Sequence, residues 1–282
     1  MFVIPGDRLP AGFAARVDEP PDPPAQPLPA ASVVLLRDSA AGPETLLLRR
    51  HQSSGFVPGA YVFPGGRLDE GDDDPGLVGG IAESLQRGGV GSGGGGADAA
   101  AGLLEPPAAC WAAGMREVFE ETGVLLAADR GGRPAPDAAA EPHLAEWRER
   151  LMNARAGLAA LLEAERLEPA LGDVVYFAHW ITPLAEPRRY DTRFFLARLP
   201  DGRQVAPDPR EMTDALWLTP AAALARFQAG SLPMVFPTVK VLETLVGFST
   251  VADALDGFRG QSVETVLPRL VRAEGGVGIV VD

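Results

Sequence analysis

Three glutamates lie close together in the segment Arg116–Val124, at Glu117, Glu120 and Glu121. If the segment is helical, positions i, i+3 and i+4 share one face, so the three carboxylates lie within about 100° of one another. A cluster of oxygen ligands suits a hard divalent cation such as Mg²⁺ or Mn²⁺. The alternative is an acidic face exposed to solvent, which any glutamate-rich helix can have. The spacing therefore indicates a metal site, provided that other elements position it.

A helix from Pro107 to Thr122 would carry these glutamates. Pro107 suits a first helical turn and Gly123 suits a helix end. The side chains opposite the glutamates can pack against a sheet; they are Trp111, Met115, Val118 and Thr122. The helix is thus expected to lie on a sheet with its acidic face turned outwards.

The residues from Arg116 to Val124 match the second half of the Nudix box, Arg-Glu-apolar-x-Glu-Glu-x-Gly-apolar, at every position. Upstream, Phe63 to Asp72 is similar to the first half of the box and contains Gly65 and Gly66. The chain departs from the box in two respects. Asp72 stands where the box has a glutamate, and Asp72 and Arg116 are 44 positions apart instead of 8. A loop longer by this amount costs only about 1.5 kcal/mol in closure entropy, so the box can still assemble.

The resemblance to the Nudix family implies a pyrophosphate hydrolase. In such an enzyme Glu117, Glu120 and Glu121 would bind divalent cations, the Gly65 carbonyl would be a further ligand, and Arg116 would orient a glutamate. The cations would bridge the pyrophosphate oxygens and activate a water molecule. The cofactor expected from the resemblance is Mg²⁺ or Mn²⁺.

A narrower resemblance runs from about Ala31 to Phe258. The segments Leu46–Arg50, Gly55–Gly66 and Arg188–Phe195 are similar to the branch that contains the peroxisomal acyl-coenzyme A diphosphatases and their bacterial relatives. This branch implies a coenzyme A or acyl-coenzyme A substrate, split into 3′,5′-ADP and (acyl)phosphopantetheine. Ser53 and Ser54 stand where the coenzyme A signature has a second arginine.

Two other functions stay open at this stage. One is the hydrolysis of a nucleotide sugar or a dinucleotide such as ADP-ribose or NADH, because substrate selection depends on loops outside the box. The other is a non-catalytic Nudix module that senses a nucleotide. A sensor predicts the loss of box carboxylates, whereas Glu117, Glu120 and Glu121 are all present.

Five residues outside the box are further candidates. Glu211 precedes an expected strand and is either an additional metal ligand or general base, or a loop carboxylate in solvent. Arg188 and Arg189 could clamp a phosphate in bidentate geometry. Arg49 and Arg50 end an expected strand beside the site, and one of them could reach the substrate because strand side chains alternate.

The pattern along the chain predicts one mixed α/β (α+β) domain, in which a mixed β-sheet lies between helices as in the Nudix fold. Residues 1–29 are rich in proline and are expected to form an extended arm. Residues 30–282 are expected to form the single domain, with a flexible insertion at 73–109 and a helical C-terminal extension at 230–282. Strands are expected at residues 31–36, 45–48, 61–63, 124–126, 174–181, 192–199 and 213–218, with a last strand near 275–282. Helices are expected at residues 81–87, 107–122, 141–165, 220–228 and 238–258, the last of these broken near 247–250.

The net charge of −13 disfavours general nucleic-acid binding, because such a field repels phosphate backbones. A small nucleotide remains the expected partner, since bound cations can reverse the local sign. No apolar stretch reaches membrane-spanning length, and neither a secretory signal nor a peroxisomal address is recognised. The single cysteine, Cys110, favours a reducing compartment. The cytoplasm is therefore the expected location, and a homodimer is an assembly that the sequence allows.

Overall fold

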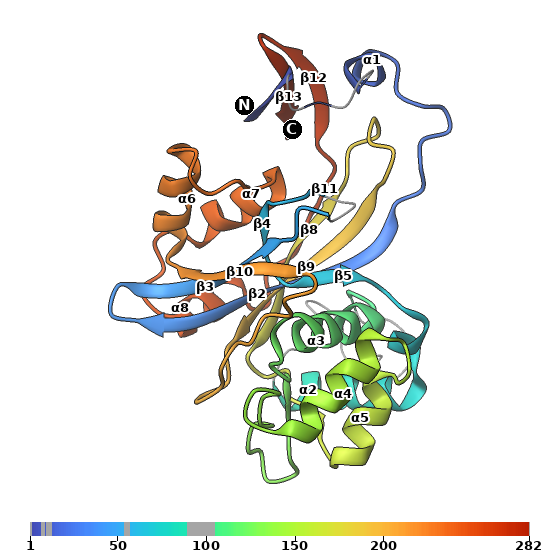
Figure 1. The fold of residues 1–282 in the computed structure, drawn as a ribbon, viewed down its shortest axis with the longest axis vertical. Helices are drawn as coiled ribbons and strands as arrows, with labels where there is room; N and C mark the ends of the chain where they lie inside the picture. Colours follow the sequence, from blue (N-terminus) through green and yellow to red (C-terminus); the bar gives the residue numbers. More distant parts are fainter. Residues whose placement is uncertain (1, 7–8, 10–12, 54–56, 89–104, 282) are drawn as a thin grey trace.

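The structure is a computed structural model, and it describes residues 2–6, 9, 13–53, 57–88 and 105–281. A large mixed sheet runs through the middle of the protein, with helices on both of its faces (Figure 1). Its strands follow the order β10-β3-β2-β9-β8-β11, with β4 paired to β3 and β5 paired to β2. The bounds are β2 (Leu28–Ser39), β3 (Gly42–Arg50), β4 (Tyr61–Val62), β5 (Gly65–Arg67), β8 (Val174–Ile181), β9 (Tyr190–Arg198), β10 (Met212–Leu218) and β11 (Thr265–Val266).

The sheet is mixed because β2 runs parallel to β9 and β11 runs parallel to β8, while the other pairs are antiparallel. The central strand β2 is buried on both faces, which explains its continuous apolar run. Val33 and Leu35 belong to the core on one face, and Val34 and Leu36 belong to the core on the other face. Because successive side chains of β2 point to opposite faces of the sheet, this strand contributes to both cores.

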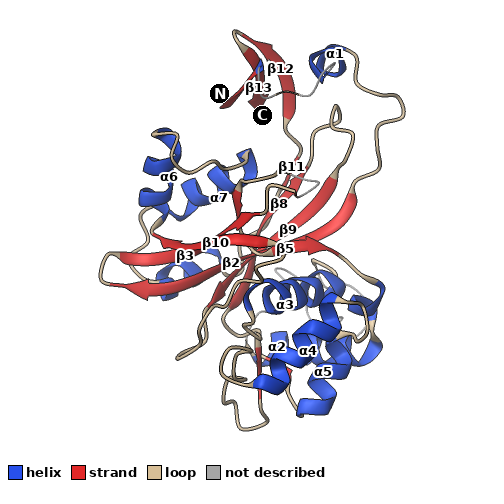
Figure 2. Cartoon of the chain, in the orientation of Figure 1, coloured by secondary structure: helices blue, strands red, loops and turns tan. Residues whose placement is uncertain are grey.

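The two groups of helices are segregated by face (Figure 2). One group contains α3 (Ala108–Thr122), the helix with the three glutamates, and its neighbours α2 (Pro75–Arg87), α4 (Pro142–Met152) and α5 (Leu158–Glu165). The other group covers the opposite face; it comprises α6 (Pro220–Gln228), α7 (Phe236–Leu245) and α8 (Val251–Phe258). The short strands β6 (Ala127–Ala128) and β7 (Glu168–Pro169) pair beside the first group. A single-turn 3₁₀ helix, η2 (Glu70–Asp73), comes directly before α2 in the sequence.

The N-terminal arm does not stay extended throughout. Its first residues form β1 (Phe2–Pro5), and α1 (Phe13–Asp18) follows. β1 pairs with β13 (Gly276–Val280), which in turn pairs with β12 (Arg269–Ala273). Both ends of the described chain therefore lie in one small three-stranded sheet (Figure 1). The expected C-terminal extension at 230–282 is helical only as far as Phe258, because the chain then returns to pair with β1.

The expected flexible insertion at 73–109 is partly a packed helix. α2 buries Leu77, Ile81 and Leu85, whose spacing places them on one face, against the core around α3. Asp74 caps its start by accepting hydrogen bonds from the Gly76 and Leu77 amides. Residues 89–104 of the insertion lie outside the described residues. Two smaller expectations also need correction: residues 124–126 are not a strand, and the expected helix at 141–165 is two helices, α4 and α5.

Candidate active site

The box segments meet where α3 lies against β5. α3 begins after Pro107 and ends at Gly123, whose amide donates to the Phe119 carbonyl, as the sequence predicts. Its apolar face is buried on the sheet through Trp111, Met115 and Val118. This burial turns the opposite face towards the loop that follows β5 and towards the residues before β10.

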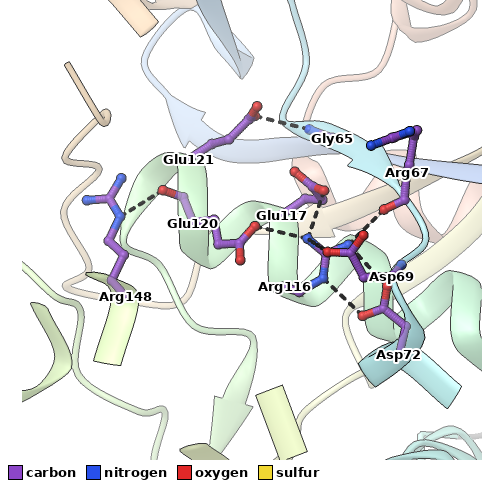
Figure 3. Close-up of polar contacts among 9 residues, drawn as sticks. All are labelled: Gly65, Arg67, Asp69, Asp72, Arg116, Glu117, Glu120, Glu121 and Arg148. Atoms are coloured by element: carbon purple, nitrogen blue, oxygen red, sulfur yellow. Dashed lines mark hydrogen bonds and ion pairs between the residues drawn. The ribbon is translucent and has the colours of Figure 1, made fainter. Parts of the chain in front are cut away.

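Arg116 contacts most of the carboxylates of the site (Figure 3). Four carboxylates lie within ion-pair distance of its guanidinium, namely those of Asp69, Asp72, Glu117 and Glu120. The Nη1 atom donates to Glu117 and to Glu120, each at 2.9 Å. The Nη2 atom donates to the Arg67 carbonyl at 2.8 Å. The Arg116 side chain thus holds both halves of the box together and orients two of the three predicted metal ligands, Glu117 and Glu120.

Asp72 stands on the opposite side of Arg116 from these glutamates. It accepts hydrogen bonds from Arg116 Nε at 3.0 Å and Nη2 at 3.1 Å, and only 1% of the residue is exposed. Its Oδ2 also accepts from the Asp69 amide at 2.8 Å, which closes the turn of η2. The shorter acid at this box position therefore binds the arginine in bidentate geometry.

Glu121 is held by the glycine turn rather than by Arg116. Its Oε2 accepts from the Gly65 amide at 3.1 Å, and the residue is 3% exposed (Figure 3). A Cβ at Gly65 would meet the Ala31 carbonyl at 2.5 Å, and a Cβ at Gly66 would meet Glu117 Oε1 at 2.3 Å. Gly65 is required because its Cβ would meet fixed backbone, whereas a Cβ at Gly66 would force the Glu117 carboxylate to move. The predicted role of the Gly65 carbonyl stays a prediction.

The three carboxylates of α3 have raised pKa values, because nearby positive charge does not fully offset their burial and mutual repulsion. Burial raises the pKa of Glu117 to about 7, and repulsion from Glu120 adds to this effect against the attraction of Arg116. Burial, followed by repulsion from Glu117, raises the pKa of Glu121 well above its ordinary value. Burial also raises the pKa of Glu120. Each of these acids would become easier to ionise beside a cation.

This donor set fits a divalent cation. Oxygen atoms of Glu117, Glu120 and Glu121 share one face of α3, and their burial and mutual repulsion would be relieved by a bound hard cation. Among the residues that the structure describes, no three His, Cys, Asp or Glu side chains already stand as a metal-binding group. The three carboxylates are instead hydrogen-bonded elsewhere, because Glu117 and Glu120 accept from Arg116 and Glu121 accepts from the Gly65 amide.

Glu211 comes to the same site from the segment before β10. Its charge raises the pKa of all three α3 glutamates, and its side chain is exposed. Its carbonyl accepts from the His51 amide at 2.9 Å, which ties it to the end of β3. Arg50 also ends β3, and its charge lowers the pKa of Glu121. The structure therefore brings Glu211 and Arg50 into electrostatic reach of the predicted metal ligands.

The C-terminal end of α3 is capped by other elements. The Arg148 Nε atom donates to the Glu120 carbonyl at 2.8 Å, the Asp208 amide to the Glu121 carbonyl at 3.1 Å, and the Ala206 amide to the Thr122 carbonyl at 2.8 Å. These bonds satisfy carbonyls that a helix end leaves without partners. Sequence reasoning missed Arg148 and Asp208. The acidic loop around Glu211 is the one sequence feature that could have indicated a role for Asp208. No feature of the sequence indicates the role of Arg148.

Asp208 in turn fixes the loop that carries Glu211. Its carboxylate accepts from Arg210 Nε at 3.1 Å and Nη2 at 2.7 Å, and its carbonyl accepts from the Glu211 amide at 3.2 Å. Arg210 continues to Glu149 of α4, with Nη2 and Oε1 at 2.9 Å. The end of the glutamate helix and the loop of Glu211 are thus one connected unit.

The remaining predicted substrate residues lie elsewhere. Arg49 points to the other face of β3, where its Nε donates to the Gly59 carbonyl at 3.3 Å and its guanidinium lies over the Tyr61 ring. Arg188 and Arg189 lie in the turn between β8 and β9, which extends away from α3 (Figure 1). Arg189 is buried and donates to the Thr182 and Ala25 carbonyls at 2.9 and 2.8 Å. These bonds make Arg189 an anchor of the N-terminal arm, which corrects its expected role as a phosphate clamp.

No helix in the described part of the chain has both the length and the apolar character needed to cross a membrane.

The chain matches a family model described as the NUDT19 Nudix domain over residues 103–245, just over half of its length. Acyl-coenzyme A diphosphatase NUDT19 of Homo sapiens is 30% identical over 248 residues, which cover 80% of this chain and 66% of that protein. The same protein of Gallus gallus is 31% identical over 239 residues, covering 74% of this chain and 63% of that protein. The chain thus spans about two thirds of the length of these curated relatives.

The fold has a relative of known structure as well. The crystal structure of a Nudix hydrolase from Alicyclobacillus acidocaldarius is 28% identical in sequence, with a TM-score of 0.64 over 84% of this chain and 99% of that chain. This match confirms the expected α/β Nudix fold with its mixed sheet between helices. Together with the family model and the Arg116-centred box, it establishes that the chain belongs to the Nudix family, in the branch of the NUDT19 Nudix domain.

Proposed function

We propose that this protein is a divalent-metal-dependent pyrophosphohydrolase that splits coenzyme A or acyl-coenzyme A into 3′,5′-ADP and (acyl)phosphopantetheine. The observation that carries the reaction class is the set of three glutamates on α3, of which Arg116 holds two and the Gly65 amide holds the third. The relatives named acyl-coenzyme A diphosphatase support the choice of substrate.

The metal proposed is Mg²⁺ or Mn²⁺, held by Glu117, Glu120 and Glu121. When bound, it supplies charge for the pyrophosphate oxygens and lowers the pKa of the attacking water. Arg116 keeps Glu117 and Glu120 oriented through its Nη1 atom, and its own charge is fixed by Asp72. Removing a glutamate should therefore impair catalysis more than folding.

Glu211 is proposed as the group that takes the proton from the attacking water at its carboxylate oxygens. It is exposed, so water can reach it, and it lies within electrostatic reach of the three metal-binding glutamates. Arg50 is proposed to contact the negatively charged phosphates from the end of β3. A small nucleotide is the proposed partner, and a homodimer in the cytoplasm is the proposed state.

A panel of substrates tests this function. The purified protein is incubated with Mg²⁺ or Mn²⁺ and with coenzyme A, acetyl-coenzyme A, ADP-ribose, NADH or a nucleotide sugar, and the products are separated by chromatography. Release of 3′,5′-ADP that stops without metal is the expected result. Cleavage of another panel member alone would retain the reaction class and reject coenzyme A, and failure to cleave any of them would favour a nucleotide sensor.

A further inference from the structure

His51 follows β3 directly, at the end of the strand that brings Arg50 to the site. Its amide donates to the Glu211 carbonyl at 2.9 Å, one position beyond the registered pair of Arg50 and Met212. Opposed residues of an antiparallel pair have Cα atoms about 5 Å apart and side chains on the same side. His51 therefore lies beside Glu211, the group proposed to take the proton from the attacking water.

A short turn fixes the His51 ring. The Ser53 amide donates to His51 Nδ1 at 3.1 Å, and the Ser53 hydroxyl lies 2.7 Å from the same atom. An amide N–H can only donate, so Nδ1 must present its lone pair to it. The proton of the neutral ring then lies on Nε2. The turn thus selects one tautomer and holds the ring in place.

The Nε2–H group of His51 is available to a ligand. The residue is exposed, and Nε2 has no hydrogen-bond partner among the residues that the structure describes. A donor that is held in one orientation suits an acceptor such as a phosphate oxygen. Hydrogen bonds to an ionised oxygen are roughly twice as strong as those between neutral groups.

The neighbours of His51 identify the acceptor. Glu211 raises the pKa of the three α3 glutamates and Arg50 lowers that of Glu121, so both act on the proposed metal site. A pyrophosphate bound there carries free oxygen atoms that accept hydrogen bonds. An ionised Glu211 can only accept, whereas Arg50 and His51 both offer donors to those oxygens.

The alternative is that His51 only closes the turn after β3. That role uses Nδ1, which accepts from the Ser53 amide, and leaves Nε2 in solvent. Because the two roles use different ring nitrogens, side chains that replace one nitrogen at a time can separate them.

We propose that His51 is a substrate-binding residue, whose Nε2–H group donates a hydrogen bond to a phosphate oxygen of the nucleoside diphosphate substrate. The proposal rests on the proposed pyrophosphohydrolase function, and it adds to that site a contact from outside the box, beside Arg50 and Glu211.

The test uses two substitutions in the full chain. His51→Gln places an amide N–H group near the position of Nε2. His51→Asn places its amide near the position of Nδ1, where it can accept from Ser53 but reaches no further. His143→Gln and His143→Asn are matched controls, because His143 is exposed on α4 and its Nε2 lies 3.1 Å from Glu165 Oε2. The values of kcat and KM for coenzyme A are measured at saturating Mg²⁺.

We expect His51→Asn to lower kcat/KM by about tenfold or more, because a hydrogen bond to a charged group is lost, and His51→Gln to lower it by less than about threefold. The His143 variants should change it by less than about twofold. A loss in His51→Gln but not in His51→Asn would show that His51 only closes the turn. Equal losses in both variants, or no loss in either, would likewise overturn the proposal.

Nitrogen NMR of the metal-free protein gives a readout that needs no turnover. The chain has three histidines, so their ring signals can be assigned by substitution. The long-range ¹H–¹⁵N spectrum should show the His51 proton on Nε2, and a proton on Nδ1 would overturn the proposal. If the unchanged protein cleaves only another member of the substrate panel, the same comparison with that substrate decides the role of His51 while coenzyme A is rejected. Cleavage of no substrate would reject both proposals.

Discussion

Asp72 and Arg116 form a bidentate ion pair in the interior, although they are 44 residues apart in the sequence. The pair joins the 3₁₀ turn before α2 to the middle of α3, and it leaves the Nη1 atom of Arg116 free to bind two glutamates. The long insertion therefore leaves and re-enters the fold at two points that are fixed to each other. The box is assembled by this contact rather than by a short loop.

Asp72→Ala should destabilise the protein by about 1–3 kcal/mol, because the buried Arg116 Nε would lose its hydrogen-bond acceptor while Glu117 and Glu120 still balance the charge. Asp73→Ala is the control, since Asp73 is exposed on the same turn. Urea unfolding measures both variants. A loss below about 1 kcal/mol for Asp72→Ala would show that the pair does not join the two halves of the box.

Gly66→Ala should lower kcat by about tenfold or more with little loss of stability. The new Cβ would lie 2.3 Å from Glu117 Oε1, so the carboxylate must move, and displacements of about 1 Å at a site of chemistry can cost a factor of 100. The control is Gly79→Ala, because Gly79 lies in α2 and a Cβ there meets nothing within 4 Å. Full activity of Gly66→Ala, measured at saturating metal, would exclude Glu117 from the reaction.

Asp208→Asn should reduce kcat by about tenfold and change KM little, because it weakens the hold of Arg210 on the loop of Glu211. Since Asp208 acts through Glu211, the double variant with Glu211→Gln should be no slower than Glu211→Gln alone. Asp201→Asn, at an exposed loop position, serves as the control. Additive losses in the double variant would contradict the link between Asp208 and Glu211.

The stability of the metal-free protein should depend on pH through Glu117. Burial raises the pKa of this group from 4.5 to about 7, so between these values the folded state retains a proton that the unfolded chain has released. The free energy of unfolding should therefore fall as the pH rises through this window. Mg²⁺ competes with that proton, so the gain in Tm on adding Mg²⁺ should be larger at pH 8 than at pH 5.5.

Thermal unfolding at several pH values, with and without Mg²⁺, measures this effect. A gain in Tm that is the same at both pH values would contradict a site built on Glu117. Glu243→Gln is a suitable control, because Glu243 is exposed on α7 and far from the box in sequence.

The parts of the fold that depend on local pattern could be predicted from the sequence. The strand at Val174–Ile181 and the helix at Pro220–Gln228 were expected with the bounds that the structure has, because apolar spacing and flanking proline or glycine residues define them. The helix with the three glutamates differs from the expected range by one residue at its start. The choice of glutamates and of Arg116 needed the box motif as well as helical spacing.

The parts that depend on distant partners could not be predicted. β1 forms because Phe2 to Pro5 meet β13, more than 270 residues later, and nothing in the proline-rich arm indicates this pairing. Only the second half of α2 was expected, as a helix at 81–87, and its first turns were obscured by glycines although Leu77, Ile81 and Leu85 are spaced by four residues. Arg148 and Asp208 cap α3 from other elements, and capping across elements has no sequence signature. The burial of Arg189 likewise depends on the Ala25 carbonyl, 164 residues away.

Metal-dependent hydrolysis at α3 is tested most directly by the rate of 3′,5′-ADP release from coenzyme A, measured for the unchanged protein and for Glu120→Gln at saturating Mg²⁺. Glu120 is held by Arg116 on the face of α3 that is proposed to bind metal. If Glu120 binds the catalytic metal, the substitution should lower kcat by about a hundredfold or more while the Tm of the metal-free protein changes by only a few degrees. Retention of most of the activity in Glu120→Gln would contradict metal-dependent hydrolysis at this helix.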